Sequence, residues 1–289
     1  MNGSPGLLRT FSSSIICDKL NCGDSIGERY HGSFYIILDC MSECMQYFES
    51  PSYAEYCKRV NGSDMKHMGM ITSDELALLF REVKLPQDSQ ILDMGCGAGH
   101  ISAALAEHYS SFVIGVDFDD DAILYAKGAF QDNTSLEFTQ LDYNEVKYDD
   151  VSFDMICFID SLYFTFTREK LRAMLDKCLK MLKPHGRLVV FWTNLPQMFE
   201  MEEPASGNTQ VGMWGTDNNV TVKAIELTEA HRQFWQKAHS EAVAMENTLK
   251  AELPEMWEDF MNERILLKGL CEKGNNGGIY RWLYIFIKQ

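Results

Sequence analysis

The chain has 289 residues, of which 46% are apolar, so it can build the core of one generous folded domain or of a domain with a cap, and it is not a disordered chain. The formal net charge of -16 is spread along the sequence, which argues against a nucleic-acid partner because phosphate backbones attract basic surfaces. Since the sequence has no uncharged apolar window of about 18 residues, the length that a membrane span needs, we expect a soluble protein without a membrane partner.

The cysteines indicate the compartment. Nine of them occur, an odd number without a C-x-x-C pair, which is typical of a protein in a reducing compartment and predicts a cytoplasmic location. Cys40 and Cys44 would share a helix face, but no nearby histidine or further cysteine completes a zinc site. We therefore expect no metal.

The N-terminal part of the chain divides into two regions. Residues 1–24 have no sustained hydrophobic period and are predicted to be a flexible N-terminus. Their serine run faintly resembles a transit peptide, but a single arginine is too little basic charge for one, so a targeting role stays open as the less favoured alternative. Apolar and aromatic residues recur at helical spacing over 25–49, and a second helix is expected between Ser50-Pro51 and Asn61-Gly62. The sequence therefore predicts an N-terminal helical cap over residues 25–72.

The next segment predicts a helix that leads into a strand, a glycine turn and a second helix. Thr72-Ser-Asp-Glu75 is a capping box, and the helix that it opens should end at Pro86. From Gln90 to Asp117 the sequence QILDMGCGAGHISAALAEHYSSFVIGVD predicts a buried strand, a tight turn, a helix and a second strand that ends on a carboxylate. Glycine is needed in that turn because the backbone must take positive φ and approach a ligand closely.

Two carboxylates flank this turn and indicate the kind of ligand. Asp93 lies two residues before the first glycine, where it would repel a pyrophosphate but can hold the ammonium of an amino-acid-like group, directly or through water. Asp117 ends the second strand, where a carboxylate can accept from both ribose hydroxyls. The site therefore favours a ligand with both an amino-acid-like cation and a ribose.

The pattern Asp93-x-Gly95-x-Gly97-x-Gly99 followed by Asp117 resembles the first two motifs of the class I S-adenosylmethionine (SAM) dependent methyltransferases. The resemblance implies that the chain binds SAM and releases S-adenosylhomocysteine (SAH). It also implies that the loop holds the methionine moiety and that the strand-end acids hold the ribose and the adenine. The cofactor-binding residues that it implies are Asp93, Gly95, Cys96, Gly97, Gly99, Asp117, Phe118, Asp142, Tyr143 and Ile159.

The later strands add candidates for catalysis. The predicted strand Leu136–Leu141 ends in Asp142-Tyr143, like the third motif of the family, and the strand Met155–Ile159 ends in Asp160. By the resemblance, Ile159 offers a main-chain carbonyl to SAM, while Asp160 and Tyr163 point at the methyl group. In the turn over residues 67–72, which resembles the family's turn near the SAM carboxylate, His67 is the one suggestive base. The candidate catalytic residues are therefore Tyr163, His67 and Asp160.

The C-terminal half completes the fold. Thr167 should cap a helix, and Lys183-Pro-His-Gly186 should turn into a strand over 187–192. Residues 193–219 are polar and irregular and are interpreted as a mobile lid. A strand over 220–227 is followed by a helical segment that reaches about Lys273 and breaks at Pro254, and the last strand covers 280–287.

These elements, together with the resemblance, imply an α/β fold: a Rossmann-like, seven-stranded, mostly parallel sheet with its last strand antiparallel and helices on both faces. Residues 73–289 would form the SAM-binding domain, with the lid and the helical insertion at about 193–273, before the last strand.

The resemblance implies an enzyme that moves a methyl group to a nitrogen or oxygen of a small-molecule acceptor. The tetrad Asn-Pro-Pro-Tyr of nucleobase and protein-amide methyltransferases is absent after the fourth strand, which disfavours those substrates. Two alternatives stay open: a carbon- or lipid-methylating enzyme of the same fold, and a catalytically silent SAM-binding regulatory protein. The acceptor itself, the use of a general base and the oligomeric state are equally open.

Overall fold

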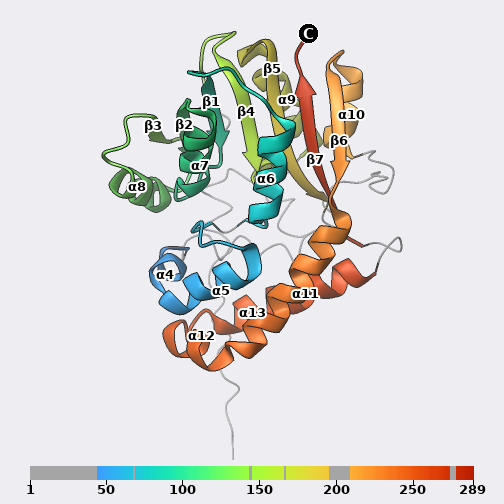
Figure 1. Ribbon diagram of the computed structural model, residues 1–289. Helices are drawn as coiled ribbons and strands as arrows, with labels where there is room; N and C mark the ends of the chain where they lie inside the picture. Colours follow the sequence, from blue (N-terminus) through green and yellow to red (C-terminus); the bar gives the residue numbers. More distant parts are fainter. Residues whose placement is uncertain (1–43, 68, 143–144, 166, 195–208, 274–277) are drawn as a thin grey trace, which may run out of the picture.

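The computed structural model describes residues 44–67, 69–142, 145–165, 167–194, 209–273 and 278–289 (Figure 1). The predicted flexible N-terminus, the predicted cap helix up to residue 43, the candidate Tyr143 and residues 195–208 of the predicted lid lie outside the described residues. None of the helices in the described part of the chain has both the length and the apolar character needed to cross a membrane.

Seven strands form one sheet in the order β3-β2-β1-β4-β5-β7-β6. They are β1 Gln90–Met94, β2 Phe112–Asp117, β3 Leu136–Gln140, β4 Phe153–Ile159, β5 Leu182–Asn194, β6 Thr221–Glu226 and β7 Tyr280–Ile287. The pairs among β1 to β5 are parallel, whereas β7 runs antiparallel to both of its neighbours, β5 and β6. The predicted Rossmann-like sheet with an antiparallel last strand is confirmed.

The strand order reverses between β1 and β4, because the chain runs from β1 outward to β3 and then returns to β4. In open parallel sheets, ligands bind at the carboxyl ends of the strands at such a reversal. The central strands are apolar and buried, as strands covered on both faces must be. The fold thus places the loop after β1 beside the end of β4.

Helices cover both faces of the sheet (Figure 1). On one face α6 (Ser73–Glu82) and α7 (His100–Tyr109) bury Leu79 and Leu105. On the other face α9 (Arg168–Met181) and α10 (Gln210–Asp217) bury Leu175 and Trp214. The remaining elements of this part are α8 (Asp120–Ala129) and the short 3-10 helix η3 (Leu162–Thr165).

The predicted capping box of α6 is present. The Thr72 hydroxyl accepts from the backbone N–H of Glu75 at 3.2 Å, and the Glu75 carboxylate accepts from the backbone N–H of Thr72 at 3.2 Å. The helix ends at Glu82, before the predicted Pro86, because Val83 already has an extended backbone.

The remaining helices form a cap beyond the carboxyl ends of the parallel strands (Figure 1). They are α4 (Cys44–Glu49), α5 (Pro51–Asn61), α11 (Thr228–Ala244), α12 (Glu246–Glu252) and α13 (Trp257–Glu272). The helices α11 to α13 are the predicted insertion between the last two strands. The limits of α5 are also as predicted, with Ser50 as its N-cap, Pro51 at its first position and Gly62 ending it at φ 88°.

The N-terminal helices and the insertion pack into a single apolar cluster. Tyr47 and Tyr53 contact Phe260 of α13 in this cluster, which also includes Ala98 of the glycine loop. The Glu252 carboxylate accepts from the hydroxyls of Ser50 and Ser52, both at 2.6 Å, and so ties α12 to the start of α5. Two regions far apart in sequence therefore form one cover over the loop after β1.

Two predictions about the C-terminal half are wrong. Residues 210–217 are not irregular but form α10, whose Trp214 is fully buried and donates from its indole N–H to Asp176 at 2.7 Å. This part of the expected lid packs on the sheet because Trp214 meets Phe286 edge to face. The turn expected over 183–186 instead lies inside β5, which begins at Leu182 and contains an irregularity in its pairing with β4.

Candidate active site

The glycine loop after β1 has three residues with positive φ, namely Gly95 at 84°, Gly97 at 51° and Gly99 at 80°. Gly99 is required by packing, because a Cβ there would lie 2.6 Å from the Phe138 ring. A Cβ on Gly97 would meet no atom within 4 Å, so this side of the loop faces open space. The loop is therefore built tightly on the protein side and left free where a ligand can approach the backbone.

Asp117 ties the end of β2 to this loop. Its Oδ2 accepts from the backbone N–H of Gly97 at 2.8 Å, and its Oδ1 accepts from the backbone N–H of Asp119 at 3.0 Å. Burial raises the pKa of the carboxyl to about 6, although these backbone donors act in the opposite direction. Because a carboxylate oxygen has two acceptor sites, each oxygen can still receive a ribose hydroxyl.

Asp93 lies beneath the loop rather than beside the open space. Its side chain is only 1% exposed, and it accepts from the Ser102 hydroxyl at 2.6 Å and from the Cys157 thiol at 3.5 Å. Burial raises the pKa of Asp93 to about 6. The sequence analysis missed Ser102, although it lies at the start of α7 among inward-facing residues.

The remaining predicted cofactor residues have different surroundings. Cys96 is buried, and burial keeps the pKa of its thiol well above the ordinary value, so the thiol stays neutral. Phe118 and Asp142 are half-buried and follow the adjacent strands β2 and β3. Since the backbone N–H of Leu141 donates to the carbonyl of Asp117 at 2.7 Å, the ends of these strands lie together. The carboxylates at 93, 117 and 142 therefore follow one edge of the sheet.

The end of β4 brings together two of the predicted catalytic residues. After the buried Ile159, Asp160 takes φ 56°, and the Tyr163 hydroxyl donates to its Oδ1 at 2.7 Å. The Ser161 hydroxyl donates to the carbonyl of Met94 at 2.5 Å and joins this segment to the end of β1. The pair Asp160 and Tyr163 thus lies at the reversal point of the sheet.

Neither residue of this pair is a free acid or base. Arg281 of β7 pairs with Asp160 at 2.6 Å and outweighs the effect of burial, so the pKa of that carboxyl is below its ordinary value. Burial and the neighbouring Asp160 carboxylate hold the pKa of Tyr163 well above its ordinary value, so its hydroxyl stays protonated at neutral pH. The sequence analysis missed Arg281, which follows the glycine loop by more than 180 residues.

His67 lies in the turn that leads to α6. Its Nε2 is 3.4 Å from the side-chain nitrogen of Asn61, and its Nδ1 is buried without a hydrogen-bond partner in the described part of the chain. Burial lowers the pKa of His67 to about 4, so the imidazole is neutral at pH 7. A neutral imidazole has one nitrogen that can accept a proton.

A cavity of about 40 Å³ lies beside His67, between α5, the following turn, α11 and α13. Its polar lining includes Tyr53, Tyr56, His67, Glu263 and Arg264, and Met70 contributes an apolar part. Tyr163 is not in this lining, so the cavity lies on the cap side of the turn over residues 67–72. The cavity therefore adjoins His67 but not Tyr163.

Arg264 is the second buried arginine near the site, and the sequence analysis missed it as well. Its Nε donates to the Tyr56 hydroxyl at 2.7 Å, and its Nη1 donates to the carbonyl of Phe260 at 2.7 Å and pairs with Glu263 at 3.0 Å. The guanidinium also lies 3.2 Å from the centre of the Phe260 ring. These contacts fix one charged wall of the cavity.

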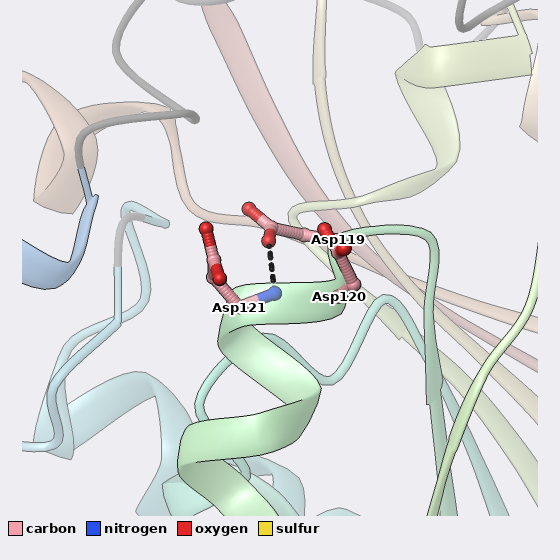
Figure 2. A group of neighbouring side chains, drawn as sticks. All are labelled: Asp119, Asp120 and Asp121. Carbon is pink, nitrogen blue, oxygen red and sulfur yellow. Dashed lines mark hydrogen bonds between the residues drawn. The ribbon is translucent and has the colours of Figure 1, made fainter.

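Three carboxylates, Asp119, Asp120 and Asp121, lie together at the start of α8 (Figure 2). Asp119 caps the helix by accepting from the backbone N–H groups of Asp121 at 3.0 Å and Ala122 at 3.2 Å. Acidic residues are favourable at this end of a helix because the N-terminus carries partial positive charge. The helix cap accounts for this group, and we propose no metal site there.

Comparisons with known proteins agree with this geometry. Residues 91–186 match a family model described as a methyltransferase domain. A sequence comparison with curated proteins gives no match.

Three of the similar solved structures show the range of enzymes with this fold. Phosphoethanolamine N-methyltransferase 2 from Haemonchus contortus, bound to phosphomonomethylethanolamine and SAH, is 13% identical with a TM-score of 0.65, covering 82% of this chain and 57% of that chain. A cyclopropane synthase from Mycobacterium tuberculosis is 13% identical with a TM-score of 0.63, and the similarity covers 85% of this chain and 98% of that chain. Geranyl diphosphate C-methyltransferase from Streptomyces coelicolor is 13% identical with a TM-score of 0.57, and the similarity covers 84% of this chain and 87% of that chain. Identities this low show the shared fold alone.

The residues of the glycine loop fit SAM. The loop is open at Gly97, and the carboxylate of Asp117 follows on the adjacent strand, within reach of the loop backbone. The fold, the matched region and this edge of the sheet agree: residues 91–186 are those of a methyltransferase domain in a Rossmann-like sheet, and SAM is the cofactor that its glycine loop fits.

Proposed function

We propose that the enzyme transfers the methyl group of SAM to a nitrogen or oxygen of a small molecule that binds in the cavity under the cap. The observation that carries this proposal is the cavity itself, which is about 40 Å³ in volume and has hydroxyl, imidazole, carboxylate and guanidinium groups in its lining. Polar groups of these kinds suit a small polar acceptor better than an acyl chain.

The proposed cofactor site follows the edge formed by β1, β2, β3 and β4. Gly95, Cys96, Gly97 and Gly99 would provide the loop backbone along the methionine moiety, with Asp93 supporting it from below. The ribose and adenine would lie at the next strand ends, and the candidates there are Asp117, Phe118, Asp142 and Tyr143. The main chain of Ile159 would border the cofactor at the end of β4. The open side of Gly97 supports this placement.

When bound, SAM supplies a methyl group that its sulfonium has already activated, so the chain mainly has to align the acceptor. For an amine acceptor, tyrosine oxygens and a carboxylate can orient the nitrogen. For a phenol, a base is also needed, and the neutral imidazole of His67 and the carboxylate of Glu263 both line the cavity. Asp160 and Tyr163 would act by holding the neighbouring turn, since Asp160 already accepts from Arg281, Tyr163 and Met70.

One alternative has support of its own. The similarity to the mycobacterial cyclopropane synthase covers 85% of this chain and 98% of that chain, more than the matched domain alone. A carbon- or lipid-methylating enzyme of the same fold is therefore the second candidate function.

A cytoplasmic location of the protein is also part of the proposal. Cys57, Cys96, Cys157, Cys178 and Cys271 are free and buried, which supports a reducing, cytoplasmic environment. The net charge of -16 supports a small-molecule acceptor over a nucleic acid.

The test is a turnover assay with SAM and three panels of acceptors: amines, phenols and unsaturated lipids. Mass spectrometry would measure SAH formation and the mass of each product, and calorimetry would measure SAM and SAH binding in parallel. Turnover with amines or phenols supports the proposal. Turnover with lipids alone favours the alternative, and cofactor binding without turnover by any panel contradicts the proposed acceptor class.

A further inference from the structure

Arg281 of β7 is fully buried, and every N–H of its guanidinium is used. Nε donates to Glu75 at 2.8 Å, while Nη1 donates to Asp160 at 2.6 Å and to Thr193 at 2.8 Å. Nη2 donates to Glu75 at 3.1 Å and to Asp160 at 3.2 Å. The arginine thus forms a two-point contact with each of two carboxylates, a geometry that a lysine cannot reproduce.

The two carboxylates belong to elements that are far apart in the sequence. Glu75 lies in the first turn of α6 and Asp160 follows β4, so Arg281 joins these two segments to the last strand. An arginine enclosed in this way must be fully paired, because an unpaired buried charge is strongly destabilising. The three side chains therefore form one rigid group.

This group holds both ends of the chain segment that enters α6. The Asp160 Oδ2 accepts from the backbone N–H of Met70 at 2.7 Å, and the Glu75 carboxylate accepts from that of Thr72 at 3.2 Å. A Cβ on Gly69 would lie 3.1 Å from the Asp160 side chain, so the backbone there packs directly on the carboxylate. The position of the turn over residues 69–72 is thus set by the two partners of Arg281.

The turn lies between two parts of the proposed site. Gly69 and Met70 line the cavity under the cap, whereas Asp160 lies at the reversal point of the sheet, next to the loop after β1. Asp160 is also held at φ 56°, a backbone conformation that a residue other than glycine keeps only where the surroundings determine it. Strained residues of this kind cluster at functional sites.

We propose that Arg281 is a positioning residue for methyl transfer: through Asp160 and Glu75 it fixes the 69–72 turn, which lines the cavity under the cap and packs on Asp160 at the edge of the sheet where the cofactor is proposed to bind. Arg281 itself touches neither SAM nor the acceptor. The proposal requires cofactor binding and does not depend on which acceptor is methylated.

The test compares the full-length wild-type enzyme with Arg281→Lys, which keeps the charge but loses the two-point contacts. Calorimetry would measure the dissociation constant of SAH, and hydrogen exchange would measure the protection of the Met70 amide. We expect SAH to bind about tenfold more weakly, as for the loss of one hydrogen bond to a charged group, and the Met70 amide to exchange faster. Wild-type affinity together with wild-type exchange in a folded Arg281→Lys enzyme overturns the proposal.

A matched control lies at the opposite end of β4. Asp154 pairs with Lys183 at 2.7 Å and accepts from the backbone N–H of Gln90 at 2.8 Å, so Asp154→Asn disturbs the same strand away from the site. We expect this variant to lose thermal stability but to keep its SAH affinity and its Met70 protection. An equal loss of SAH affinity in Asp154→Asn would mean that the effect is one of general stability, and the proposal would fail.

A second variant covers the case in which Arg281→Lys does not fold. Glu75→Gln keeps the pair between Arg281 and Asp160 and weakens only the contact between Arg281 and residue 75 of α6. We therefore expect a smaller change in SAH affinity and in Met70 exchange. If Glu75→Gln leaves both measurements unchanged, Glu75 does not hold the turn and the proposal is wrong. The exchange measurement needs no ligand, so it separates a failure of this inference from a failure of the enzyme to bind SAH.

Discussion

The backbone N–H of Gly97 donates to the Asp117 carboxylate at 2.8 Å, and this bond joins the open part of the glycine loop to the end of β2. One carboxylate therefore has two tasks in the proposed site. It fixes the shape of the loop in the protein itself, and its remaining acceptor capacity can serve a ribose.

We expect Asp117→Ala to weaken the binding of SAM and SAH. The variant loses two proposed hydrogen bonds to the ribose, each worth about 1–3 kcal/mol, and it also loses the bond that fixes Gly97. Calorimetry with both ligands measures the effect, and Asp120→Ala at the exposed start of α8 serves as a control that should bind normally. Unchanged affinity in a folded Asp117→Ala variant would remove the ribose assignment.

Gly97 and Gly99 allow two separate tests, one of the space left for the ligand and one of the packing of the loop. Gly97→Val should abolish SAH binding while the sheet stays folded, because its side chain enters open space where the ligand is proposed to lie. Gly99→Ala should instead lower the thermal stability, because its Cβ would lie 2.6 Å from the Phe138 ring. Calorimetry and thermal unfolding of both variants separate the two effects. Normal SAH binding by Gly97→Val would contradict the proposed cofactor position.

The sequence was sufficient to predict the elements whose cause is local. The glycine loop, the capping box of Thr72 and Glu75 and the ends of α5 depend on residues a few positions apart, and all three are present. The role of Arg281 could not be predicted from the sequence, because it depends on two carboxylates that only the folded sheet brings close to the arginine. In the same way, α10 was missed because its helix buries Trp214 on Phe286, a residue of the last strand.

The pKa of Asp93 predicts a stability that depends on pH. Because burial raises this pKa to about 6 in the folded protein, the folded state binds a proton that the unfolded chain, with its ordinary lower pKa, has released. The contribution to the free energy of unfolding is therefore present at low pH and is lost as the pH rises through about 6. The asparagine side chain of Asp93→Asn does not bind this proton, so the variant lacks this pH-dependent contribution.

Urea denaturation of the wild type and of Asp93→Asn at about pH 5 and about pH 7 measures this dependence. The free energy of unfolding of the wild type, relative to the variant, should fall by about 1 kcal/mol over this range. Asp117 titrates in both proteins, so its own effect cancels in the comparison. A difference that stays constant or grows with pH would show that Asp93 is ionised in the folded protein.

Tyr163→Phe tests whether the hydroxyl takes part in proton transfer. Since this hydroxyl donates to Asp160 and its pKa is well above the ordinary value, it should not serve as a base. We expect the phenylalanine variant to keep most of its turnover and its SAH affinity. Tyr163→Ala should lower turnover, because it also removes the ring that packs on Trp192 at 5.5 Å. Full turnover by Tyr163→Ala would show that the Tyr163 ring does not help to hold the neighbouring turn.

The last prediction concerns His67, whose buried Nδ1 has no hydrogen-bond partner among the described residues and whose ring lines the cavity under the cap. Because burial lowers its pKa to about 4, the imidazole is already neutral above about pH 5, and a reaction that uses it as a base should show no loss of rate near pH 6.5. With a phenol as acceptor, we expect His67→Asn to lower kcat while the dissociation constant of SAH stays unchanged. With an amine acceptor, which keeps a free lone pair when it is deprotonated in solution, the same variant should retain its kcat. Rate profiles from pH 5 to 8 for both acceptor classes, measured on the wild type and on His67→Asn, decide between these roles. A fall in kcat of the wild type centred near pH 6.5, absent from the variant, would show that His67 titrates at its ordinary pKa and is not the buried base proposed for this cavity.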